Sequence, residues 1–210
     1  MATKGEMVRA SAAIFGLNPN MVDAMARALA QAGLRSPGGR GRAAAAMTGK
    51  DVFHLNLALA AGIETKDAPE FISRLTELEL VYGELWKDDN LRWEVSNGIL
   101  RSKLLALLSR LPVPGLELAP TFGDFCGLWL DAGFEDRAGG FANTKVSVEI
   151  STNGPHAVFS HQSDAGDLKV FFGLEPGRIK KPVWERRVMM SDALFRKLSA
   201  LAGAGEIESD

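Results

Sequence analysis

The apolar positions of the first sixty residues follow a helical period. From 4 to 15 and from 19 to 31, apolar residues recur at spacings of three and four, which predicts two amphipathic helices. Gly16-Leu17-Asn18 interrupts the pattern, Asn18 is a good N-cap, and Pro19 suits the first position of the second helix. A third helix is predicted to begin at the capping-box-like stretch Thr48-Gly49-Lys50-Asp51 and to end at Gly62.

The helical period continues through the middle of the chain. Apolar residues predict two longer helices near 67–87 and 90–111, with a turn at Asp88-Asp89-Asn90. Such a pair could form an antiparallel hairpin that associates with copies of itself. Trp86 and Trp93, on either side of the turn, are then expected in the core or in an oligomer seam. Pro112-Val113-Pro114-Gly115 is the best candidate for a linker.

The last hundred residues change from a helical to an alternating pattern. A capped helix is predicted to start at Thr121. From 145 to 151 apolar and polar residues alternate, which is typical of a half-buried strand. Further strands are predicted at 157–160, 168–172 and 183–190, and a final helix over 191–202.

Charge is distributed unevenly along the chain. Residues 1–50 hold seven Lys and Arg against two acids, a formal charge of +5, and the remaining 160 residues carry −7. This basic N-terminal segment, the head, precedes an acidic remainder, which favours a polyanionic partner bound at the head. The alternative is uneven surface charge with no such partner.

The first two helices resemble the helix-turn-helix of bacterial and phage repressors over residues 7–32. Ala12 stands four residues before Gly16, Leu17 follows the glycine, and Val22 and Met25 fill the apolar positions of the second helix. The resemblance implies that the second helix enters the major groove of DNA. The alternative is an ordinary helical hairpin, because Ala and Gly are common residues.

A glycine- and arginine-rich stretch, Gly38-Gly39-Arg40-Gly41-Arg42, follows the second helix. In winged helix-turn-helix proteins a loop at this position lies on the DNA backbone or in the minor groove, and Arg favours a narrow minor groove. We interpret the stretch as an arm or rudimentary wing; the alternative is a flexible linker. The candidate DNA-binding residues are therefore Asn18, Asn20, Asp23, Arg27, Gln31, Arg35, Arg40 and Arg42. Asp23 is the weakest of these, since an acid repels phosphate unless it accepts from a cytosine.

The sequence contains no recognisable catalytic or metal-binding pattern. His54 lies in an apolar helix, and His156 and His161 are expected on opposite sides of one strand. Cys126 cannot form an internal disulfide and suits a reducing compartment. We therefore expect no enzyme activity, no cofactor and no metal. Neither an apolar run of about 18 residues nor a secretory signal is visible, so we expect a cytoplasmic protein that does not meet a membrane.

These patterns predict an α-helical N-terminal helix-turn-helix region and helical hairpin, followed by a small α+β domain with an antiparallel sheet of three to four strands. The predicted boundaries are 1–62 for the DNA-binding region, 63–112 for the hairpin and 113–210 for the α+β domain. We expect a sequence-specific transcriptional regulator of bacterial or prophage origin that binds double-stranded DNA as a homo-oligomer.

Two other functions stay open at this point. The order of parts is similar to that of phage small terminase subunits, which would imply a DNA-packaging recognition subunit that assembles as a ring. The other alternative is a protein–protein adaptor. In each case the C-terminal α+β domain could dock a protein partner.

Overall fold

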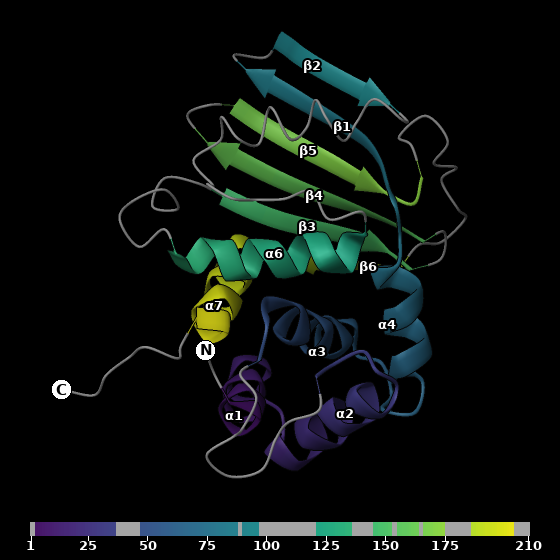
Figure 1. Ribbon diagram of the computed structural model, residues 1–210, viewed down its shortest axis with the longest axis vertical. Coiled ribbons are helices and arrows are strands. Elements are labelled where there is room, and N and C mark those ends of the chain that lie inside the picture. The colour runs from purple at the N-terminus through teal and green to yellow at the C-terminus, as the bar shows by residue number, and fades with distance from the viewer. Residues whose placement is uncertain are drawn as a thin grey trace, which may run out of the picture.

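The N-terminal helices gather at one end of the molecule, and an antiparallel sheet forms the other end (Figure 1). The computed structural model describes residues 3–36, 47–87, 90–96, 121–135, 145–152, 155–163, 166–174 and 186–203. Over these residues the chain belongs to the α+β class.

The first three helices form where the local sequence predicts them. They are α1 (Lys4–Phe15), α2 (Pro19–Gln31) and α3 (Gly49–Ala61). Thr48 and Asp51 form a reciprocal capping box at the start of α3. Gly16 and Gly62 end α1 and α3 at φ 64° and 61°, a left-handed conformation that costs glycine little.

The prediction of two long central helices is wrong over the part of this region that the structure describes. Helix α4 covers only Ala68–Thr76, and strands β1 (Leu80–Lys87) and β2 (Asn90–Ser96) follow as an antiparallel pair. In this pair Leu85 stands opposite Trp93, and Trp86 stands opposite Leu91. Aromatic and β-branched residues fit a pleated surface, and pairing across the sheet overrides the helical spacing. The remainder of the predicted second helix, 97–111, and the predicted linker at 112–115 lie outside the described residues.

The sheet has six strands rather than three or four. Strands β3 (Lys145–Ser151), β4 (His156–Ser163), β5 (Gly166–Phe172) and β6 (Arg187–Met190) join β1 and β2 in the order β2-β1-β5-β4-β3-β6. Every neighbouring pair is antiparallel. The count rises because the predicted helical hairpin supplies two strands, and β1 pairs with β5.

Two helices link the sheet to the N-terminal helices. Helix α6 (Phe122–Glu135) runs across the sheet, with α7 (Asp192–Gly203) beside it and α3 on its far side (Figure 1). Phe125 of α6 meets Phe159 of β4 edge to face at 5.0 Å between ring centroids, and Phe122 meets Phe53 of α3 at 5.3 Å. Aromatic pairs in this geometry contribute about 0.5–1.5 kcal/mol each beyond their buried area.

One hydrophobic core runs through all of these layers. It extends from Met7 of α1 through α3 and α6 to Phe172 of β5 and Ala202 of α7. The boundaries predicted at 62 and 112 therefore separate residues that share this core, and the sheet itself crosses the second boundary. Within the described part of the chain, no helix combines the length and apolarity that a membrane crossing requires.

Candidate nucleic-acid interface

The turn between α1 and α2 is fixed by backbone hydrogen bonds. The N–H groups of Gly16 and Leu17 both donate to the carbonyl of Ala12 and close the end of α1. The side chain of Asn18 then accepts from the backbone N–H of Asn20 at 2.8 Å. Asn18 is therefore the N-cap of α2, as the sequence predicts. Its carboxamide oxygen accepts the bond that stabilises the turn. A three-residue connection containing glycine is typical of helix-turn-helix units.

The apolar positions that carry the helix-turn-helix resemblance face inward. Val22 is fully buried, Ala12 and Met25 are each 3% exposed, and Leu17 is partly buried. Helices α1, α2 and α3 contact one another pairwise. The apolar positions of the pattern are thus buried as the resemblance requires. Helix α2 packs against its neighbours through one face only.

The polar side of α2 lies on the surface at the end of the molecule farthest from β2 (Figure 1). Asn20, Arg27 and Gln31 are all exposed, and they fall on one face at spacings of seven and four. The structure therefore brings three of the predicted reading residues together on an accessible helix face.

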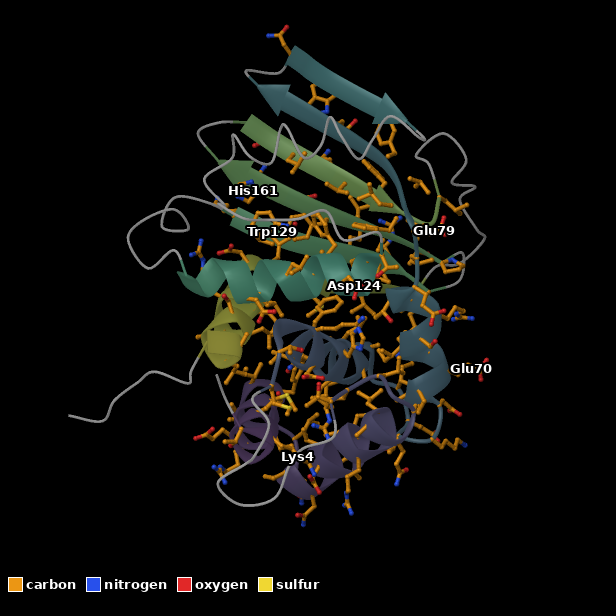
Figure 2. The ribbon with its side chains drawn as sticks, viewed as in Figure 1. Lys4, Glu70, Glu79, Asp124, Trp129 and His161 are labelled. Atoms are coloured by element: carbon orange, nitrogen blue, oxygen red, sulfur yellow. The ribbon has the colours of Figure 1, made fainter. Side chains whose placement is uncertain are left out.

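Asp23 lies between two cations. Its carboxylate is 2.8 Å from Nζ of Lys4 on α1 and 3.1 Å from Nε of Arg27, one turn further along α2. Figure 2 shows Lys4 at the α1–α2 end of the molecule. The hydrogen bond from Lys4 is the main cause that lowers the pKa of Asp23, partial burial opposes it, and the charges of Lys4 and Arg27 add to the lowering. The group of three carries one net positive charge, which answers the objection that Asp23 would repel phosphate.

Arg35 takes a different place from the one predicted for it. It is 4% exposed, and its Nε donates to the carbonyl of Ala26 at 3.0 Å while Nη1 lies 3.3 Å from Sδ of Met47. A guanidinium that is buried and bonded in this way fastens the end of α2 instead of facing a ligand. We therefore treat Arg35 as a structural residue. Arg40 and Arg42 lie outside the described residues.

Both flanks of the glycine- and arginine-rich segment are held by one buried carboxylate. Asp51, 3% exposed, accepts from the backbone N–H of Ser36 at 2.6 Å through Oδ1, and from the N–H and hydroxyl of Thr48 at 3.0 Å through Oδ2. Ser36 and Thr48, the described residues near the two ends of this segment, are thus bonded to the same carboxylate. The sequence marks Asp51 as a capping residue, but nothing in it signals the bond to Ser36.

The buried histidines and the cysteine sit in packed surroundings. His54 Nδ1 bonds to the carbonyl of Leu34 at 2.7 Å, and burial lowers the pKa of this imidazole. The ring of His161 lies 5.0 Å from that of Trp129 between centroids, tilted by 41°, and burial lowers the pKa of His161 to about 4 (Figure 2). Burial raises the pKa of the Cys126 thiol, which disfavours the reactive thiolate. The described residues contain no group of three or more His, Cys, Asp or Glu suited to hold a metal ion.

An apolar groove of about 400 Å³ borders the first half of α2. It is lined by the turn and α2 on one side and by the end of α3 with the loop before α4 on the other: Leu17, Met21, Met25, Ala58, Leu59, Gly62, Ile63, Glu64 and Thr65. Met21 on its wall is 44% exposed. The groove gives this end of α2 an apolar border beside its polar face.

Comparison with known protein families, with curated proteins and with solved structures finds no match to this chain. The candidate interface therefore depends on its own geometry and charge.

Proposed function

We propose that this protein binds double-stranded DNA through the polar face of α2 and acts as a sequence-specific transcriptional regulator of bacterial or prophage type. The observation that carries the proposal is the open polar face of α2, with Asn20, Arg27 and Gln31 exposed above buried helix-turn-helix positions. Asn, Gln and Arg are side chains that pair with base edges in the major groove.

The distribution of charge along the chain also supports DNA as the partner. The first fifty residues carry a formal charge of +5 in a chain whose net charge is −2. Arg40 and Arg42 belong to a segment whose two flanks meet at Asp51, beside the end of α2. In the proposal these arginines contact phosphates or the minor groove next to the site that α2 reads, which adds affinity without sequence preference.

The packaging alternative loses the feature that suggested it. Its likeness to small terminase subunits depended on a central helical hairpin, and residues 80–87 and 90–96 form β1 and β2 instead. The adaptor alternative differs from the main proposal in a simple way: it requires no affinity for DNA. Homo-oligomerisation stays a prediction, to be checked by the mass of the protein in solution.

Titration of labelled duplexes at two salt concentrations tests the proposal. We expect affinity to fall steeply with salt, with a slope of about 0.9 in log units for each phosphate contact. Arg40→Ala combined with Arg42→Ala should weaken binding to all sequences alike, and Asn20→Ala should reduce discrimination between sequences.

The matched control removes two exposed arginines that lie outside the N-terminal helices, Arg187→Ala in β6 with Arg196→Ala in α7. This variant should bind DNA as the parent protein does. Absence of binding to any duplex at low salt would contradict the proposal and favour the adaptor.

A further inference from the structure

The side chain of Arg27 is held at one end and open at the other. Its Nε lies 3.1 Å from Oδ2 of Asp23, four residues earlier on the same helix. The side chain is 62% exposed, and no partner of its two terminal nitrogens is found among the residues that the structure describes. Nε thus forms an ion pair with the carboxylate and donates its hydrogen bond to the backbone carbonyl of Asp23 at 3.5 Å, and the outer fork of the guanidinium is left accessible.

Asp23 is itself anchored from the neighbouring helix. Nζ of Lys4 lies 2.8 Å from Oδ1, and Arg27 occupies the side of Oδ2. The hydrogen bond from Lys4 lowers the pKa of Asp23 and so stabilises its charged form. The three residues form a chain from α1 to the exposed face of α2, and each charge in it has a neighbour of opposite sign.

The open fork of Arg27 has the geometry that guanine requires. A guanidinium has five N–H donors in one plane, and the two terminal nitrogens match O6 and N7 of guanine in the major groove. Holding Nε against Asp23, by the ion pair with its carboxylate and the bond to its carbonyl, restricts the rotamers of a flexible side chain before it meets DNA, which reduces the entropy lost on binding. Lys4 offsets the charge of Asp23, so the group as a whole still attracts a phosphate backbone.

We propose that Arg27 reads a guanine in the major groove and that Asp23, anchored by Lys4, is the positioning residue that aims it. This inference rests on the proposed function and narrows it to a class of target: duplex DNA with a guanine at a fixed place in the site. Asn20 precedes Arg27 by seven residues on the same face, about 10 Å along the helix. At about 3.4 Å per base step, that distance spans about three base pairs, and asparagine pairs best with adenine. The expected site therefore holds an adenine and a guanine about three steps apart.

Selection from a randomised duplex pool, followed by titration of the selected duplex and its single-base variants, tests the inference. The parent protein should prefer guanine at one position by roughly 5- to 150-fold over the other bases. Arg27→Ala should abolish that preference. Arg27→Lys keeps the charge but loses the fork, so it should keep affinity for unrelated DNA and still lose the preference.

Asp23→Ala separates positioning from a general structural role. We expect it to lose much of the guanine preference, while its affinity for unrelated DNA stays equal or rises because an acid has been removed. In the Arg27→Ala background the same change should have no further effect on the preference. If Asp23→Ala fails to fold, Asp23→Asn, which keeps the size of the side chain, provides the same test. Arg9→Ala, which removes an exposed arginine of α1, is the charge-matched control and should retain the preference.

The outcomes distinguish the two proposals. A parent protein that binds DNA with no guanine preference, or one whose preference survives in the Arg27 or Asp23 variants, would overturn this inference and leave DNA binding intact. A parent protein that binds no DNA would overturn the proposed function as well.

Discussion

Gly49 of α3 and Gly127 of α6 face each other with no room for a side chain between them. A Cβ atom added to Gly127 would lie 2.9 Å from Cα of Lys50, and one added to Gly49 would collide with the carbonyl oxygen of Gly127. The backbone N–H of Gly49 also donates to Oδ1 of Asp131 at 2.7 Å. Because both colliding atoms belong to backbone, the two helices are held at a separation that only glycine allows.

Gly127→Ala should therefore destabilise the protein by about 1–3 kcal/mol or more, since the helices must move apart to admit a methyl group. The free energy of unfolding, measured by urea titration, checks this. Gly5→Ala in α1 is the control, because the nearest atom to its new Cβ would be Nη1 of Arg9 at 3.8 Å. An equal loss in both variants would contradict the close approach of α3 and α6.

Substitution by alanine should destabilise the protein at Arg35 and leave its stability nearly unchanged at Arg27. Arg35→Ala removes a buried charged donor from the carbonyl of Ala26 and should cost about 1.5–3 kcal/mol of folding free energy. Arg27→Ala removes an exposed ion pair and should change stability by less than about 0.5 kcal/mol. Paired urea titrations measure both values. A destabilisation of Arg27→Ala as large as that of Arg35→Ala would assign Arg27 to the fold rather than to the interface.

Asp51→Ala should destabilise the protein by about 2–4 kcal/mol, because it leaves the N–H groups of Ser36 and Thr48 without their charged acceptor. Urea titration gives the change in free energy. Asp67→Ala is the matched control, since Asp67 stands at the start of α4 without a side-chain capping bond. Retention of parent-like stability by Asp51→Ala would show that the two flanks do not depend on this carboxylate.

The free energy of unfolding should decrease as the pH falls from neutral, because His161 is protonated more readily in the unfolded chain than in the native protein. Burial lowers the pKa of this imidazole from 6.5 to about 4, and neither ring nitrogen has a hydrogen-bond partner among the residues that the structure describes. Below pH 6.5 the unfolded chain takes up a proton that the native protein refuses until about pH 4. Stability is therefore complete above the unfolded pKa and is lost as pH falls toward the folded one. Between pH 7.5 and 5 this linkage amounts to about 2 kcal/mol.

Urea titrations at pH 7.5 and pH 5 measure this effect. His161→Leu should lose about 2 kcal/mol less than the parent protein over that interval. His156→Gln, on the same strand but partly exposed, should lose as much as the parent. The same pH dependence in His161→Leu and in the parent would assign the effect to other groups, among them His54, whose pKa burial also lowers.

The elements predicted correctly are those whose signals are local. Thr48 with Asp51, Asn18 with Pro19, and the glycines at 16 and 62 each define a helix end within a few residues. The strands at 80–96 were missed because their hydrogen-bond partners are remote: Leu80 pairs with Phe172 of β5. Val81, Tyr82 and Trp86 prefer strands, and Gly83 disfavours a helix, but the helical spacing before them masked both signals.

In the candidate site, too, the features that depend on local sequence could be predicted and those that depend on contacts between remote residues could not. The exposed face of α2 follows from its periodicity, since the apolar positions define the buried side and Asn20, Arg27 and Gln31 fall opposite. The ion pair of Asp23 with Arg27 has the spacing of four that a helix allows. Lys4 could not be assigned to it, because that contact depends on how α1 crosses α2. The burial of Arg35 was missed because its bonds, to the carbonyl of Ala26 and to Sδ of Met47, depend on how the chain after α2 folds back onto that helix.

Helix α3 sets a limit on how the proposed DNA-binding head can be handled. Its side chains are buried around nearly its whole circumference, since it packs on α1 and α2 on one side and on α6 and α7 on the other. A polypeptide cut after this helix would expose Phe53, whose ring packs near those of Phe122 in α6 and Phe195 in α7, to water, and an exposed apolar patch of this kind favours aggregation. The proposed DNA-binding head therefore depends on the rest of the chain: α6 and α7 cover one side of α3, so loss of these helices through proteolysis or a premature stop would uncover the core of the head as well.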